Sequence, residues 1–111
     1  MAALTSLAVT LAGVTPAPVA VSASDTIAAT QFGPTGVHVR VINGGASPDT
    51  VTITDPNLTV MGDAATNPTV SVANATTKVI AIPLSAINAG TGVATIAHSF
   101  ITSVTCEVWK V

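Results

Sequence analysis

Few side chains of this 111-residue chain could perform chemistry. Apart from lysine and arginine, the ionisable candidates are Asp25, His38, Asp49, Asp55, Asp63, His98, Cys106 and Glu107. They are widely dispersed, and no local spacing typical of zinc hydrolases, nucleophile elbows, phosphate-binding loops or dithiol centres occurs. The sequence therefore predicts no catalytic residue, no metal site and no cofactor. We expect His38 and His98 to lie on solvent or interface faces of strands.

Cys106 is the only cysteine, so the chain can form no internal disulfide. In the stretch "VTCEVWKV" it alternates with Val104 and Val108, which predicts a small buried side chain. An activated thiol would need a neighbouring histidine or cation, and the sequence cannot place one there. Burial is therefore the interpretation that the pattern favours.

Charge is scarce in this chain. Hydrophobic residues make up 49% and charged residues 7%, whereas a typical soluble domain has about 25% charged residues. The fixed cations are Arg40, Lys78 and Lys110, which form no basic patch for nucleic acid or for an anionic membrane. No uninterrupted apolar run reaches the roughly 20 residues of a membrane span. The composition indicates a folded protein that is held against another surface.

Runs of β-branched residues alternate with clusters of Gly, Pro, Asn and Asp. This pattern predicts an all-β fold, a single antiparallel β-sandwich of the jelly-roll or immunoglobulin-like kind. The predicted strands are residues 7–11, 19–22, 37–42, 50–54, 69–73, 78–82, 93–97 and 104–110. The stretch "PLSAINAG" is the one plausible helical piece, of a turn or two.

Two local arrangements follow from the alternation. Residues 37–42 should pair antiparallel with residues 50–54, as a hairpin in which Gly44 and Gly45 take positive φ. In the last strand Val104 and its alternate neighbours should face the core, which places Trp109 on the outer face. An outward tryptophan would be covered either by the N-terminal segment or by another chain.

The first 30 residues differ from the rest. They contain one charge, Asp25, and the prolines Pro16 and Pro18 favour an extended path. We therefore predict an extended N-terminal arm or edge strand over residues 1–30 and a β-sandwich domain over residues 31–111. Pro16, Pro18 and Trp109 are the interface candidates.

The order of motifs along the chain carries a resemblance. The motifs are "VTLAGVTP" (9–16), "FGPTGVHVRVINGG" (32–45), "VTITDP" (51–56), "TVSVANATTKVIAIPLSAIN" (69–88), "GVATIAHS" (92–99) and "VTCEVWKV" (104–111). In this order they resemble the small β-rich head decoration proteins, or capsid cement proteins, of tailed bacteriophages.

The resemblance implies a structural virion protein, not an enzyme, on the outer surface of the capsid. Its partners would be the major capsid protein and further copies of itself, most plausibly as a homotrimer, with no nucleic acid and no membrane. Threonine-rich faces suit such a role, because each threonine offers a methyl for packing and a hydroxyl for hydrogen bonding. The alternative is an immunoglobulin-like adhesion or tail module that binds a host surface.

Overall fold

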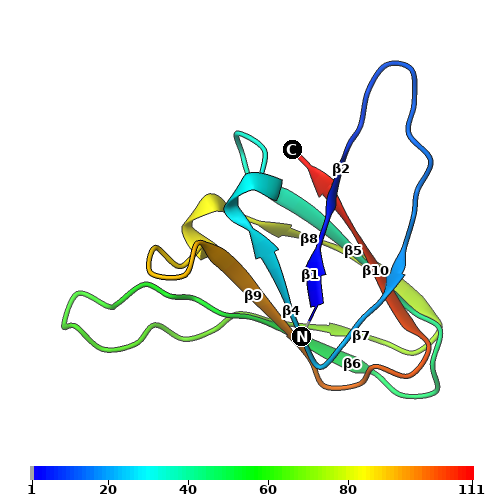
Figure 1. Ribbon diagram of the computed structural model, residues 1–111. Coiled ribbons are helices and arrows are strands. Elements are labelled where there is room, and N and C mark those ends of the chain that lie inside the picture. Colours follow the sequence, from blue (N-terminus) through cyan, green and yellow to red (C-terminus); the bar gives the residue numbers. More distant parts are fainter. Residues whose placement is uncertain (1) are drawn as a thin grey trace.

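Two five-stranded sheets pack face to face in the computed structural model, which describes residues 2–111 (Figure 1). The first sheet has the order β1 (Ala2–Leu4), β4 (Ser24–Ala28), β9 (Val93–His98), β6 (Asp49–Ile53) and β7 (Thr69–Val72). The second has the order β2 (Ser6–Ala8), β10 (Val104–Lys110), β5 (Val37–Asn43) and β8 (Thr76–Ile82), and β3 (Val19–Ala20) also pairs with β10. Two short 3₁₀ helices, η1 (Ala29–Gln31) and η2 (Leu84–Ala86), complete the elements.

The all-β sandwich is confirmed, but the prediction that its sheets are purely antiparallel was wrong. β1 pairs in parallel with β4, and β2 pairs in parallel with β10. The reason lies in residues 2–8, which pass from the edge of one sheet to the edge of the other while keeping one chain direction. A single extended run thereby closes the same side of both sheets (Figure 1).

Residues 2–30 form no long extension, and β1 and β2 lie at the edges of the two sheets. β1 and β2 are paired strands, and β4 lies inside the first sheet between β1 and β9. The physical reason is that sheet edges leave backbone groups to be paired, and the N-terminal residues pair with them. Only residues 9–18 of this region lie outside the sheets, as the loop between β2 and β3.

The predicted hairpin was wrong as well, because its two strands lie in different sheets. β5 pairs with β10 and β8, whereas β6 pairs with β7 and β9. Asn43 stabilises the connection from β5 to β6. Its Nδ2 donates hydrogen bonds to Ser47 O at 2.8 Å and Val72 O at 3.0 Å. Its Oδ1 accepts one from Gly45 N at 2.9 Å. Alternation fixed the buried face of each strand but not its partner.

Gly44 and Gly45 do not take the positive φ that the hairpin required. At Gly45, the close approach of neighbouring atoms explains why the residue is glycine. A Cβ at Gly45 would lie 2.3 Å from Phe100 Cε2 and 2.4 Å from Thr102 O. A Cβ at Gly44 would meet only Ser103 O, at 3.2 Å.

Replacing Gly45 by alanine is therefore expected to lower the free energy of unfolding by about 1–3 kcal/mol, the usual cost of overpacking. Gly44→Ala is the matched control and should cost clearly less, since its one close contact is a single carbonyl oxygen. Urea unfolding followed by circular dichroism measures both. Equal losses for the two variants would contradict the packing argument.

The core lies between the two sheets and is built mostly from valine and isoleucine side chains. β5 and β10 provide its centre with Val39, Val41, Val104 and Val108, each no more than 2% exposed. Cys106 is 1% exposed, so the predicted inner face of the last strand is confirmed. Ile27 and Ile96 oppose them from the first sheet.

Candidate interaction surface

Three ionisable side chains that are far apart in the sequence meet in the interior. His98 Nδ1 lies 2.6 Å from Asp49 Oδ2, and His98 Nε2 lies 3.9 Å from Asp25 Oδ2. Asp49 Oδ1 also accepts hydrogen bonds from Ser99 N at 3.0 Å and Phe100 N at 3.2 Å. The expectation that His98 lies on a solvent or interface face was wrong, since its side chain is 1% exposed.

This buried cluster is built to hold strands together. It joins β4, β6 and β9, and Ser22 Oγ lies within hydrogen-bond distance of Asp25 Oδ1 and of Ser24 O. None of the three residues lines the pocket at the edge of β10 or the pocket at the base of residues 54–68. Within residues 2–111, no histidine, cysteine or acidic side chains form a group of three that could hold a metal ion. The arrangement offers cross-strand stability and no exposed nucleophile.

A second charged pair lies on the outer face of the second sheet. Arg40 and Glu107 are opposite one another in the β5–β10 register, with Arg40 Nη2 2.6 Å from Glu107 Oε1. The Arg40 guanidinium lies 5.6 Å from the centroid of the Trp109 ring, a distance suited to a cation–π contact. Trp109 is half-buried, and Leu7 of β2 is its neighbour in the parallel register.

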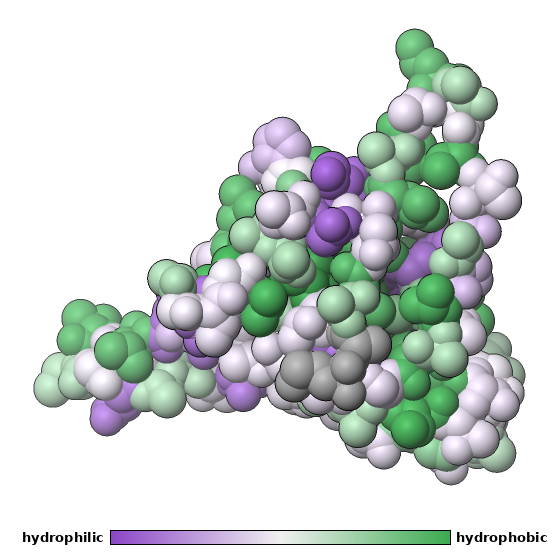
Figure 2. Space-filling model, in the orientation of Figure 1, coloured by the Kyte–Doolittle hydropathy of each residue, from purple (hydrophilic) through white to green (hydrophobic). Residues whose placement is uncertain are grey.

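Two loops project from the sandwich (Figure 1). One is residues 9–18, which contains Pro16 and Pro18 and connects β2 to β3. The other is residues 54–68, between β6 and β7. Figure 2 shows apolar surface at the ends of both projections. Both tips are apolar where a free protein would normally present polar groups.

Each loop exposes large apolar side chains. In the first loop they are Val9, Leu11 and Val14, and in the second they are Leu58, Val60 and Met61. Leu11 and Val60 are fully exposed, at 111% and 105%, and Met61 is 88% exposed. We name residues 58–61 the apolar tip.

Hydrogen bonds within each loop fix the shape of the turn. In the longer loop Thr59 N donates to Asp63 O at 2.7 Å, and Gly62 N donates to Thr59 O at 2.9 Å. In the shorter loop Gly13 N donates to Thr10 O at 3.0 Å. Gly62 and Gly13 have φ of 88° and 85°, which glycine adopts at no steric cost. The apolar residues are thus presented by defined turns.

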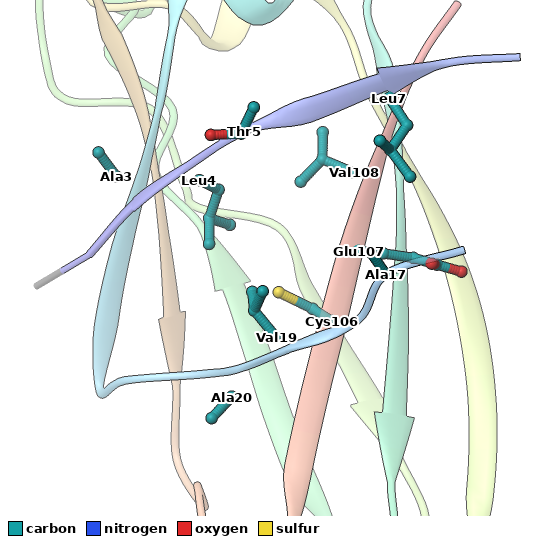
Figure 3. Close-up of a pocket in the computed structure, with 10 residues that line it drawn as sticks. All are labelled: Ala3, Leu4, Thr5, Leu7, Ala17, Val19, Ala20, Cys106, Glu107 and Val108. Atoms are coloured by element: carbon teal, nitrogen blue, oxygen red, sulfur yellow. The ribbon is translucent and has the colours of Figure 1, made fainter. Parts of the chain in front are cut away.

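A pocket of about 390 Å³ lies at one edge of β10 (Figure 3). It forms because β10 changes partner there: Cys106 is opposite Val19 of β3, whereas Val108 is opposite Ser6 of β2. The pocket is lined by Ala3, Leu4, Thr5, Leu7, Ala17, Val19, Ala20, Cys106, Glu107 and Val108. A second pocket, of about 80 Å³, lies at the base of residues 54–68.

Cys106 is expected to resist modification in the folded protein. Burial, together with the nearby carboxylates of Asp25 and Glu107, raises the pKa of its thiol from 9.0 to about 12. At pH 8 a thiol-reactive disulfide reagent should label the native protein at least about a thousandfold more slowly than the urea-unfolded protein. Labelling at equal rates would contradict the burial.

Because of this pKa shift, the free energy of unfolding depends on pH in the alkaline range. The unfolded thiol ionises near pH 9, while the folded thiol stays protonated until about pH 12. The contribution of Cys106 to stability is therefore intact below pH 9 and falls as the pH rises from 9 towards 12.

No helix among residues 2–111 has the length and apolar character that crossing a membrane requires. Comparisons of the chain with models of protein families, with curated proteins and with solved structures found no match. The proposals that follow therefore rest on the residues and geometry of this chain, and on the resemblance of its motifs to head decoration proteins.

Proposed function

We propose that this chain is a structural virion protein that decorates and stabilises a bacteriophage capsid by binding the major capsid protein. The observation that carries the proposal is the pair of projecting loops whose large apolar side chains face solvent. A binding role without catalysis accounts for them, because neither loop contributes to the core of its own chain. The resemblance of the motifs supplies the capsid as the surface that is bound.

The energetics favour a protein partner for these loops. Fully burying a valine, leucine or methionine side chain contributes about 1.5–3 kcal/mol, so even partial burial of several such residues would drive association. The cores of protein interfaces are depleted of charge, and residues 9–18 carry none. A capsid repeats its binding sites many times, and linked contacts raise the overall affinity without new chemistry.

Several finer features belong to the same proposal. The sandwich would be of the jelly-roll or immunoglobulin-like kind, and copies would associate as homotrimers on the outer surface of the capsid. Pro16, Pro18 and Trp109 remain the candidate interface residues, with both prolines in the projecting loop 9–18 and Trp109 half-buried beside β2.

An adhesion or tail module that binds a host surface is the second candidate, because recognition loops also project from a rigid sandwich. Recognition loops of that kind are rich in tyrosine, with tryptophan at their strongest contacts. The chain has no tyrosine, and residues 9–18 and 54–68 contain no aromatic side chain. The loops fit apolar docking on a protein better than adaptable polar recognition.

Mass spectrometry of purified full and empty particles tests the proposal. The protein should be present in many copies per particle, in a fixed ratio to the major capsid protein. Recombinant protein should co-sediment with undecorated capsids and raise the temperature at which they break. Particles that contain no copies would overturn the decoration role, and presence only in tails would favour the second candidate.

A further inference from the structure

One dipeptide after β5 is chemically unstable wherever the chain is unconstrained. Asn43 is the only asparagine that is followed by glycine, at Gly44. The main-chain nitrogen after an asparagine can attack the side-chain amide, which makes asparagine a thermolabile residue. Glycine has no Cβ, so it leaves that nitrogen unhindered. The other asparagines precede leucine, proline or alanine; they are Asn57, Asn67, Asn74 and Asn88. Asn43 therefore has the highest intrinsic reactivity among them.

The fold encloses this reactive amide. Asn43 is the last residue of β5, opposite Val104 of β10 and Thr76 of β8, and it is 1% exposed. Its Nδ2, the nitrogen that deamidation would release, donates to Ser47 O at 2.8 Å and to Val72 O at 3.0 Å. The four other asparagines are exposed. The most reactive asparagine is thus the one that the structure buries.

The attacking nitrogen is held as well. Gly44 N donates a hydrogen bond to Ser103 O at 3.0 Å, in the loop before β10. Gly45 N donates to Asn43 Oδ1 at 2.9 Å, which fixes the carbonyl side of the amide. Attack would require the Asn43 side chain to turn onto Gly44 N, and that movement breaks hydrogen bonds on both sides. The reaction must therefore wait for this region to open.

We propose that Asn43 is a modification site of the unfolded chain, where it deamidates spontaneously and the product cannot regain the fold. Gly44 N forms a bond to Asn43 Cγ and gives up its proton, while the Cγ–Nδ2 bond breaks and ammonia leaves with that proton. Water then opens the cyclic imide at either carbonyl and leaves aspartate or isoaspartate at position 43. Water is the only co-reactant.

Neither product suits the place that Asn43 occupies. An aspartate carboxylate has no hydrogen to donate, so it would face Ser47 O and Val72 O as one acceptor against two others. A charge buried in this way is costly. Isoaspartate inserts an extra carbon into the main chain, which would displace Gly44 N from Ser103 O. Deamidation thereby makes unfolding irreversible, whether or not the chain binds capsids.

Peptide mass spectrometry of folded and unfolded protein tests the site. Both samples are kept at mildly alkaline pH, one of them in guanidinium chloride, with a reductant that keeps Cys106 from linking two chains. In the unfolded sample Asn43 should deamidate at least about tenfold faster than Asn74 or Asn88, which precede alanine. In the folded sample Asn43 should react at least about a hundredfold more slowly than in the unfolded one. Equal rates in either comparison would overturn the proposal.

Refolding measures the consequence of the reaction. Unfolded protein is held for increasing times and diluted into native buffer, and circular dichroism gives the fraction that refolds. This fraction should fall in step with deamidation of Asn43, and the refolded protein should contain only unmodified Asn43. Asn43→Asp supplies one product directly, and it should melt at least about 10 °C below Asn74→Asp, the same change at an exposed turn. Equal melting temperatures, or deamidated chains among the refolded protein, would contradict the block to refolding.

Gly44→Ala is the matched control. It keeps Asn43 and its partners, and its Cβ would meet only Ser103 O, at 3.2 Å, so the variant should fold. The added methyl hinders the attacking nitrogen. In the unfolded state the variant should therefore deamidate at Asn43, and lose its capacity to refold, at least about tenfold more slowly than the wild-type protein. Loss of refolding at the wild-type rate would overturn the assignment to Asn43.

Discussion

Replacing Asp49 by alanine is expected to lower the free energy of unfolding by about 3–5 kcal/mol, the scale of removing one partner from a buried, hydrogen-bonded pair of ionisable side chains. Asp49 is fully buried and lies 2.6 Å from His98. Its second oxygen accepts the hydrogen bonds of two consecutive main-chain amides, Ser99 and Phe100. Alanine would leave the histidine and both amides buried without this partner, and each unsatisfied group adds a cost of its own.

Urea unfolding measures this loss, and two further variants serve as comparisons. Asp63→Ala removes a carboxylate from the exposed loop 54–68 and should change stability by no more than about 0.5 kcal/mol. Asp49→Asn keeps an oxygen for the two amides but loses the charge beside His98, so its effect should fall between the other two. A loss below about 1 kcal/mol for Asp49→Ala would show that the cluster does not stabilise the fold.

Strand positions and buried faces were largely predictable from this sequence. The alternation in β5 and β10 is strict, because one face of each strand meets the core, and both were predicted within one residue of their bounds. β4 was missed, since "SDTIA" has a charged residue where a core strand normally has an apolar one. Asp25 is nevertheless buried there, with Ser22 N and Oγ donating to its carboxylate and His98 Nε2 3.9 Å away.

Strand partners were not predictable, and the site depended on them. Asp25, Asp49 and His98 meet because β9 lies between β4 and β6, a neighbourhood that no local pattern specifies. The same applies to the pocket, which exists because β2 and β3 share one edge of β10. The turns at Gly13 and Gly62 could be recognised as breaks, but whether such a turn projects depends on how the sheets are placed.

The N-terminal residues illustrate the consequence for experiments. A deletion of residues 1–18 would remove β1 and β2, which pair with β4 and β10, so lost capsid binding would not distinguish contact from misfolding. Substitutions at exposed loop positions avoid this difficulty, because they remove apolar surface without unpairing a strand.

Changing Val60 and Met61 together to aspartate is expected to weaken binding to undecorated capsids by at least about a hundredfold. Both side chains are almost fully exposed at the apolar tip, so they contribute little to the stability of the free protein. Burying the two against a partner is worth about 3–6 kcal/mol in total, and each 1.4 kcal/mol corresponds to a factor of ten. Desolvating two new carboxylates would add to the loss.

The control is a double change of equal charge, Ala89→Asp with Thr91→Asp, at exposed positions outside the apolar tip. Both double variants should unfold at the same urea concentration as the wild-type protein, because neither alters a core residue. If only the tip variant fails to co-sediment with capsids, loss of apolar contact is the cause rather than added charge. Undiminished binding by the tip variant would remove the observation on which the decoration proposal rests, since the most exposed apolar residues of loop 54–68 would then have no part in it.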